Sequence, residues 1–158
     1  MTGAAGPGVG VVRDAADLAA CMEVREAVFV IEQGVPAELE YDELDAVATH
    51  FLARAADGSP LGTARLLHGR AAEPRTGAGP TVGSLGRLAV TGAARGTGVG
   101  AHLVRAVEAE AARIGLEAVD LHAQTHALGF YERLGYRAHG PEFPDAGIPH
   151  RAMRRALV

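Results

Sequence analysis

RLAVTGAARGTGVGAHLV, residues Arg87 to Val104, joins an apolar run to an amphipathic helical pattern through three glycines that alternate with other residues. Glycine weakens a helix, so Gly96, Gly98 and Gly100 at a helix entrance indicate a backbone that approaches a ligand closely or takes positive φ. Backbone N–H groups at a helix start are unpaired and bind anions, and Arg95 adds a positive charge beside them. The pattern predicts a loop that binds a pyrophosphate, and a flexible glycine-rich turn is the alternative.

Length and composition are those of one globular domain. The chain has 158 residues, of which 48% are hydrophobic and 22% charged, enough to bury a sizeable core. We expect a flexible start at residues 1–8, which are small and rich in Gly and Pro, and a single domain over residues 9–158. No run approaches the ~18 consecutive apolar residues of a membrane span, and the first residues lack the features of a signal peptide.

Charge and cysteine usage narrow the range of partners. The formal net charge is −4 and no basic tail stands out, which argues against nucleic acid because phosphate neutralisation needs a basic face. A single cysteine excludes an intramolecular disulfide framework and suits a reducing cytoplasm. All 15 basic residues are arginine, so a single arginine is weak evidence for a functional site. Glycines at a fixed spacing remain good evidence. We therefore expect a cytoplasmic protein that binds neither nucleic acid nor membrane.

Hydrophobic periodicity predicts the element order β-α-α-β-β-β-α-β-α-β-β. The helix after the glycines has apolar residues at Val99, Leu103 and Val107, and Gly115 supplies its stop. Gly and Pro content predicts loops at residues 69–80 and 141–149. Strands are expected at residues 9–13, in a hairpin over 50–67, and at 81–90, 117–123, 136–140 and 150–157. Helices are expected at 14–29, 99–114 and 126–135, with a short helix or turn at 37–46.

Two familiar phosphate-binding loops fit the glycines less well. A Walker loop needs Lys-Ser/Thr after its glycines, and the chain has no lysine. The dinucleotide fingerprint G-x-G-x-x-A is matched literally by Gly96, Gly98 and Ala101, with Asp120 in a strand further on. Against it, the residues TGAAR separate the strand from the glycines, and only the last 38 residues follow Asp120, too few for the further βα units of that fold.

A third interpretation explains the spacer. RLAVTGAARGTGVGAHLV resembles the acetyl-CoA-binding motif of the GNAT superfamily of N-acetyltransferases, a strand and short connection followed by Arg/Gln-x-x-Gly-x-Gly/Ala; residues 95–100 match it in full. QTHALGFYERLGY, residues 124–136, resembles the family's second signature, a polar residue before a helix that carries a tyrosine and ends in Gly-Phe/Tyr. The segments REAVFVIEQGVP and GIPH, with Asp42, Asp45 and His50, further resemble the ElaA-like branch.

The resemblance, which covers residues 9–157, implies an α/β fold with a mixed, centrally splayed β-sheet and helices on both faces. It also implies acetyl-CoA as the co-substrate of a direct acetyl transfer to an amine. The acceptor is expected to be a small-molecule or peptide amine; its identity and the oligomeric state stay open, a homodimer included. The implied cofactor residues are Leu88, Ala89, Val90, Arg95, Gly96, Thr97, Gly98, Val99, Gly100, Ala101, Gln124 and Tyr131.

Two residues receive chemical roles from the resemblance. Tyr131 is the expected general acid, since a neutral phenol can protonate the departing thiolate, and the Val90 N–H is the expected donor to the tetrahedral intermediate. The alternatives are a core aromatic residue and an ordinary core strand. The base stays open, and its candidates are Glu32, Glu40, Asp42, Asp45, His50 and His150. Gln33, Asp42, His50 and His150 lie in ElaA-like segments and are the candidates for the base or for the acceptor site.

Acidic residues and histidines leave further alternatives. Five carboxylates in residues 37–46 form either a negative entrance for a cationic amine or a solvated acidic face. His122 and His126 are four residues apart but span a strand end and a helix start, so we expect no metal site. Beside acetyl transfer, two functions stay open: a CoA-binding family member without catalysis, and a dinucleotide-binding oxidoreductase.

Overall fold

The computed structural model describes residues 8–157, which group into two compact units. Unit 1 comprises residues 8–65 and 87–107, and unit 2 comprises residues 66–86 and 108–157. Of the predicted flexible start, residues 1–7 lie outside the described part of the chain. The predicted single domain stays a prediction, and each unit is described by itself below.

Unit 1 holds the N-terminal strands and helices, the glycine loop, and the segments of β3, β4 and α4 that begin or end in it. Its first helix starts where the sequence predicts, because the Asp14 side chain accepts the Asp17 N–H at 2.8 Å as an N-cap. The elements are β1 (Gly8–Val11), α1 (Ala15–Arg25), the π-helix η1 (Glu26–Glu32), α2 (Ala37–Glu40), η2 (Glu43–Ala46), β2 (Thr49–Arg54), β3 (Pro60–Leu67), the end of β4 (Val82–Val90), η4 (Gly92–Ala94) and the first half of α4 (Val99–Arg113).

Unit 2 holds the C-terminal half of the sheet and the second signature segment. Gly115 has φ +89° and follows α4, and the Leu116 N–H donates to the Ala111 carbonyl at 2.9 Å, which confirms the predicted stop. Its further elements are η3 (Gly69–Ala71), α3 (Glu73–Thr76), β5 (Ala118–Gln124), η5 (Thr125–Ala127), α5 (Leu128–Arg133), β6 (Arg137–Asp145) and β7 (Ile148–Ala156).

The strands form a mixed sheet in the order β1-β2-β3-β4-β5-β7-β6, as the fold prediction requires. β4 and β5 pair in parallel, whereas β1 with β2, β5 with β7, and β6 with β7 pair antiparallel. The parallel ladder runs only from Val82 to Leu85 on β4, although β4 continues to Val90. The ladder therefore ends in the middle of both strands, before the residues Leu88, Ala89 and Val90 that the resemblance assigns to the cofactor.

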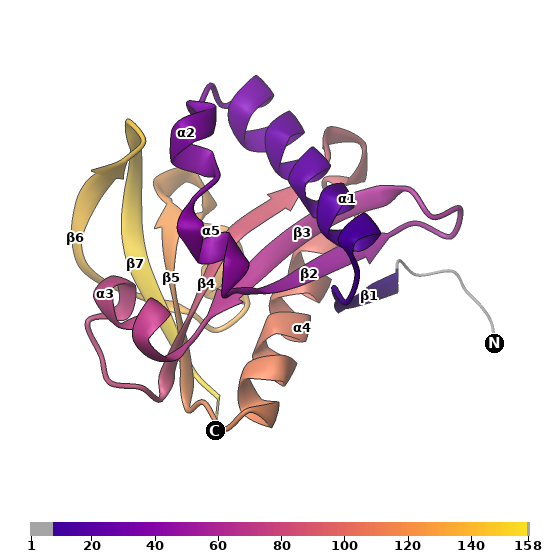
Figure 1. Ribbon diagram of the computed structural model, residues 1–158. Helices are drawn as coiled ribbons and strands as arrows, with labels where there is room; N and C mark the ends of the chain where they lie inside the picture. The colour runs from indigo at the N-terminus through magenta and orange to yellow at the C-terminus, as the bar shows by residue number, and fades with distance from the viewer. Residues whose placement is uncertain (1–7, 158) are drawn as a thin grey trace. The chain divides into compact units, whose positions relative to one another are not determined.

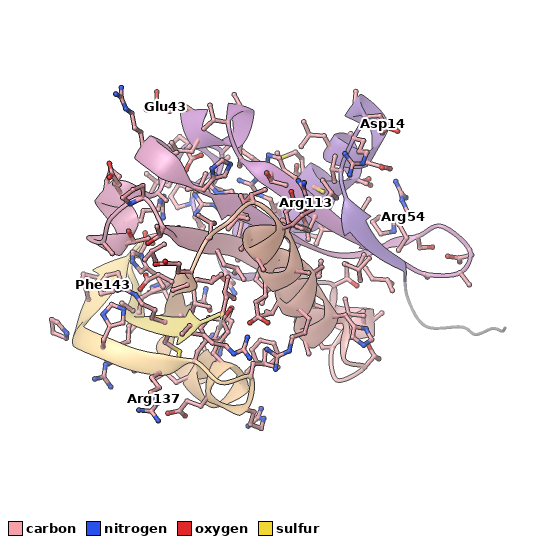
Figure 2. The ribbon with its side chains drawn as sticks, turned by 90° about the horizontal axis from the view of Figure 1, so that it is seen from below. Asp14, Glu43, Arg54, Arg113, Arg137 and Phe143 are labelled. Carbon is pink, nitrogen blue, oxygen red and sulfur yellow. The ribbon has the colours of Figure 1, made fainter. Side chains whose placement is uncertain are left out.

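Helices cover both faces of the sheet within unit 1, and Figures 1 and 2 place α1 and α4 on opposite sides of its strands. On the α1 side, Cys21 packs on Leu52 of β2. On the α4 side, Leu103 and Val99 approach Gly62 of β3 so closely that an added Cβ would lie 2.8 Å from the Leu103 side chain. A residue larger than glycine at position 62 would therefore force the Leu103 side chain to move and would crowd the Ala89 carbonyl, which would lie 3.0 Å from the Cβ.

Two predicted loops are wrong in part. Residues 69–80 contain η3 and α3, because Pro74 suits the first turn of a helix and Gly77, at φ +62°, caps it. Residues 141–149 mostly belong to β6 and β7, which Figure 1 shows as a hairpin at the sheet edge. β6 tolerates its prolines because it is the edge strand, and its register is irregular between His139 and Phe143.

Candidate active site

The glycine loop of unit 1 lies between η4 and α4. Gly96 and Gly98 have φ of +80° and +90°, a region that side chains other than glycine rarely adopt. The helix makes its first internal hydrogen bond from the His102 N–H to the Gly98 carbonyl at 3.0 Å, so the N–H groups of residues 99–101 precede it. Residues 95–98 are exposed. The loop thus offers backbone donors and the positive end of a helix to an anion.

The side chains of the loop hold its shape. The Thr97 hydroxyl donates to the Ala94 carbonyl. Arg95 donates from Nε to the Val90 carbonyl at 3.1 Å and pairs with Glu32 at 2.8 Å, which lowers the pKa of the Glu32 carboxyl. Both members of this pair are nearly half exposed, so water screens it and an anionic ligand can compete for Arg95.

The strand end before the loop combines a buried anchor with half-buried neighbours. Ala89 is 2% exposed and packs with Val24 and Val28 of the first helices. Leu88 and Val90 flank it with intermediate exposure. Because the β4–β5 ladder ends at Leu85, these residues lie beyond the part of β4 that pairs with β5. Their main-chain groups occupy the stretch that the sequence predicts for the pantetheine arm.

Three of the five carboxylates in residues 37–46 pair with arginines. The Asp42 carboxylate contacts Arg65 at 2.7 Å and Arg87 at 3.2 Å. Burial raises the pKa of Glu40, which is 3% exposed. Burial alone would also raise the pKa of Asp45, but hydrogen bonds from Arg25 and other arginine contacts outweigh it and lower that pKa. A negative entrance would need carboxylates without a cationic partner. Because three of the five are paired with arginines, the segment is less negative than the sequence alone suggests.

Unit 1 contains two other candidates for acceptor binding, the buried His50 and the exposed Gln33. His50 is 7% exposed, and its Nε2 lies 2.8 Å from the Asp45 carbonyl. A carbonyl only accepts, so Nε2 carries a hydrogen in this contact. Gln33 is exposed and follows η1, where its N–H donates to the Val28 carbonyl at 3.1 Å.

Unit 2 brings Gln124 and His150 together as register partners of β5 and β7. The Gln124 side-chain oxygen lies 2.6 Å from Nε2 of His126. Nδ1 of His150 lies 2.7 Å from the Ile148 carbonyl, which makes Nδ1 the donor and Nε2 the acceptor nitrogen of the neutral imidazole. The ring stacks on Phe143 at 6.1 Å, and Figure 2 labels Phe143 on the β6–β7 hairpin.

Tyr131 lies on α5 and is 8% exposed. Its ring packs edge-on against Phe130 at 4.9 Å and Tyr136 at 6.0 Å. Burial raises the pKa of the Tyr131 phenol, so the group keeps its proton at neutral pH. Tyr136 has a separate structural partner, because its hydroxyl donates to Glu108 at 2.8 Å.

Comparison with known proteins gives the family. The family model for the acetyltransferase (GNAT) domain matches residues 14–157. This chain belongs to the GNAT acetyltransferase family. It is 41% identical over 134 residues to the uncharacterized N-acetyltransferase YjcF of Bacillus subtilis (strain 168), covering 84% of this chain and 87% of that protein.

Solved structures of GNAT relatives agree with the fold. An acyl-CoA N-acyltransferase from Pseudomonas aeruginosa is 32% identical with a TM-score of 0.78, covering 97% of this chain and 100% of that one. ElaA of Escherichia coli is 25% identical with a TM-score of 0.80, covering 95% of this chain and 99% of that one. ElaA is the member that names the branch suggested by the sequence, so the resemblance is confirmed at the level of family and fold.

Family membership also bears on the alternatives. In this GNAT chain the glycines follow the fourth strand and η4, whereas a dinucleotide fingerprint follows a first strand directly, which argues against the oxidoreductase. Among residues 8–157, no group of three or more His, Cys, Asp and Glu side chains could hold a metal ion. None of the helices in that range is long and apolar enough to cross a membrane.

The arginine partners of the acidic segment have little signal in the sequence. Because every basic residue of the chain is arginine, Arg25, Arg65 and Arg87 do not stand out from the others. The one local signal was Arg25 within the ElaA-like segment REAVFVIEQGVP. The left-handed backbone of Arg87, at φ +54°, has no sequence signal, because glycine is the residue expected there.

Proposed function

We propose that this chain transfers an acetyl group from acetyl-CoA to a primary amine by direct attack. The observation that carries the proposal is the loop of residues 95–100. Two glycines with positive φ lead into a helix whose first N–H groups precede its first internal hydrogen bond, and Arg95 lies beside them. A pyrophosphate carries the charge and the several acceptor oxygens that such a loop can bind.

The rest of the cofactor is assigned to the strand end. Main-chain groups of Leu88, Ala89 and Val90 would hydrogen-bond the pantetheine arm as an added strand does. The buried side chain of Ala89, packed with Val24 and Val28, supports this role because it keeps the backbone in place. The Val90 N–H would donate to the oxygen of the tetrahedral intermediate, where a fixed donor lowers the barrier most.

Two proton transfers complete the reaction. Tyr131 would protonate the departing thiolate. Burial raises the pKa of its phenol, so the group carries the proton at neutral pH, although the same shift makes it a weaker acid. The amine must lose a proton before it attacks. Of the candidate bases we favour His150, because Nδ1 donates to the Ile148 carbonyl and Nε2 is then the nitrogen that can accept a proton in the neutral imidazole. The carboxylate of Asp42 is less suited, since Arg65 and Arg87 already neutralise it.

The acceptor would be a small-molecule or peptide amine in the cytoplasm. The test is a calorimetric titration of the protein with CoA and acetyl-CoA, followed by a CoA-release screen over polyamines, amino acids, aminoglycosides and peptides. Binding with release for at least one amine class supports the proposal. Binding without release across the panel favours a CoA-binding member without catalysis, and no binding of either nucleotide refutes the proposal.

A further inference from the structure

Six charged side chains of unit 1 form one ion-pair network around the acidic segment. Their formal charges cancel, since three are arginines and three are carboxylates. Arg25 and Arg65 are each 1% exposed. We call this group the arginine–carboxylate network, and its members are Arg25, Arg65, Arg87, Glu40, Asp42 and Asp45.

The two buried arginines bind the acidic segment from α1 and β3. Arg25 contacts Glu40 at 2.6 Å and Asp45 at 2.7 Å. Arg65 contacts Asp42 at 2.7 Å and Asp45 at 2.9 Å. Each carboxylate is therefore held in place before the third arginine is considered.

Arg87 adds β4 to the network. Its Nε lies 3.0 Å from Glu40 Oε1, and its Nη2 lies 3.2 Å from Asp42 Oδ2. The same two nitrogens donate to the Glu40 main-chain carbonyl at 3.2 and 3.1 Å. The backbone of Arg87 is left-handed, with φ +54°, and the next residues along the chain are Leu88, Ala89 and Val90.

Stability alone does not explain this arrangement. When an ion pair is buried, the free energy of hydration that it loses is about as large as the attraction that it gains. Apolar side chains of similar volume often stabilise a fold as well or better. Nε of Arg65 is buried with no hydrogen-bond partner among the described residues. A left-handed arginine adds strain at the same place, and such strain is typical of functional sites.

We propose that the arginine–carboxylate network positions the backbone of residues 88–90 for acetyl-CoA, with Arg87 as the positioning residue. The guanidinium, held by Glu40 and Asp42, keeps the Arg87 backbone left-handed. That conformation sets the direction of the following N–H and C=O groups. With an ordinary extended φ at Arg87, those groups would rotate away from the pantetheine. The inference rests on the proposed function, which assigns these groups to the cofactor.

The test removes the guanidinium but leaves the backbone free to stay left-handed. Arg87→Gly does so, because glycine adopts positive φ without a steric cost. We expect CoA affinity measured by calorimetry to fall about tenfold, or about 1.4 kcal/mol at 25 °C. The control Arg54→Ala, which removes an ion pair to Asp17 elsewhere in unit 1, should bind CoA like the unchanged chain. Figure 2 labels Arg54 on its strand.

A double-variant cycle separates positioning from general destabilisation. Glu40→Gln should also weaken CoA binding, and the Arg87→Gly/Glu40→Gln pair should bind about as well as the weaker single variant, since both disrupt one unit. If the double variant instead loses CoA affinity by the product of the two single losses, the inference is overturned. It is also overturned by an Arg87→Gly variant that binds CoA as well as the unchanged chain does, whether or not its unfolding temperature changes.

Two results would make the Arg87→Gly comparison unusable, a variant that does not fold and an unchanged chain that binds no CoA. If Arg87→Gly does not unfold cooperatively, Arg87→Lys decides, because lysine keeps the charge but cannot span both carboxylates as the guanidinium fork does. A loss of CoA affinity in that variant supports the inference, and unchanged affinity refutes it. If the unchanged chain itself binds no CoA, the proposed function fails and this inference fails with it.

Discussion

Replacing Gly98 by alanine tests whether the left-handed backbone of the glycine loop is what binds CoA. Gly98 has φ +90°, and a Cβ added there would meet no atom within 4 Å. The substitution therefore introduces no clash, and its only direct cost is conformational. An L-residue in the left-handed region is disfavoured by about 1–2 kcal/mol.

The size of the binding effect follows from that cost. In the free variant the loop can relax to negative φ, which reorients the peptide groups that precede α4. CoA can then bind only after the loop returns to the left-handed conformation, so the free energy of CoA binding becomes less favourable by the same amount. A penalty of about 1–2 kcal/mol corresponds to a loss of about 5–30-fold in affinity. The fold should persist, because the loop is exposed and Val99, the first residue of the helix, is unchanged.

Gly58 provides a closely matched control. It has φ +89°, its Cβ would also meet no atom within 4 Å, and it lies in the hairpin turn between β2 and β3. Gly58→Ala should lower the thermal unfolding midpoint by about 2–8 °C, from the same penalty and about 2–4 °C per kcal/mol for a chain of this size. Its CoA affinity, measured by calorimetry, should not change.

The two variants together can refute the reasoning. If Gly98→Ala binds CoA as tightly as the unchanged chain does, the left-handed backbone is not needed for binding. If Gly58→Ala weakens CoA binding to the same extent, the effect at Gly98 reports general destabilisation. Gly98→Val extends the series, and we expect it to abolish CoA binding in a chain that still unfolds cooperatively.

Three other variants test the roles of buried groups. Tyr131→Phe should lower turnover more than acetyl-CoA affinity, because it removes the proton donor and keeps the ring; an unchanged rate assigns Tyr131 to the core. Tyr136→Phe removes a buried hydrogen bond to Glu108, whose charge keeps its contact with Arg155, and should cost about 1.5–3 kcal/mol, or about 3–12 °C in the unfolding midpoint. A calorimetric midpoint equal to that of the unchanged chain would contradict this. Burial lowers the pKa of His122, so the unfolded chain binds the proton first and stability falls as the pH drops below the unfolded value of about 6.5. His122→Gln should flatten the loss of thermal midpoint between about pH 7 and pH 5.5, and an equally steep loss in the variant would count against the assignment.

Local features of the fold were predictable because they depend on neighbouring residues. The apolar stripe of α4 follows from Val99, Leu103 and Val107, and its end follows from Gly115. The β6–β7 hairpin was less visible, since its turn uses Ala146 and Gly147 with φ of +52° and +77° in place of the usual Asn-Gly or Asp-Gly signal. Composition favoured a loop there, and edge pairing to β7 made it strand.

The sequence by itself determined the glycine loop and the family, because positive φ at glycine and hydrophobic periodicity are properties of short segments. Only the tertiary structure decided what the acidic segment does. The ion pair of Arg25 with Glu40 and that of Arg87 with Asp42 join residues far apart in the chain, and no local pattern specifies such partners. The fold brings those charges out of water together, and a buried charge must then find its opposite nearby.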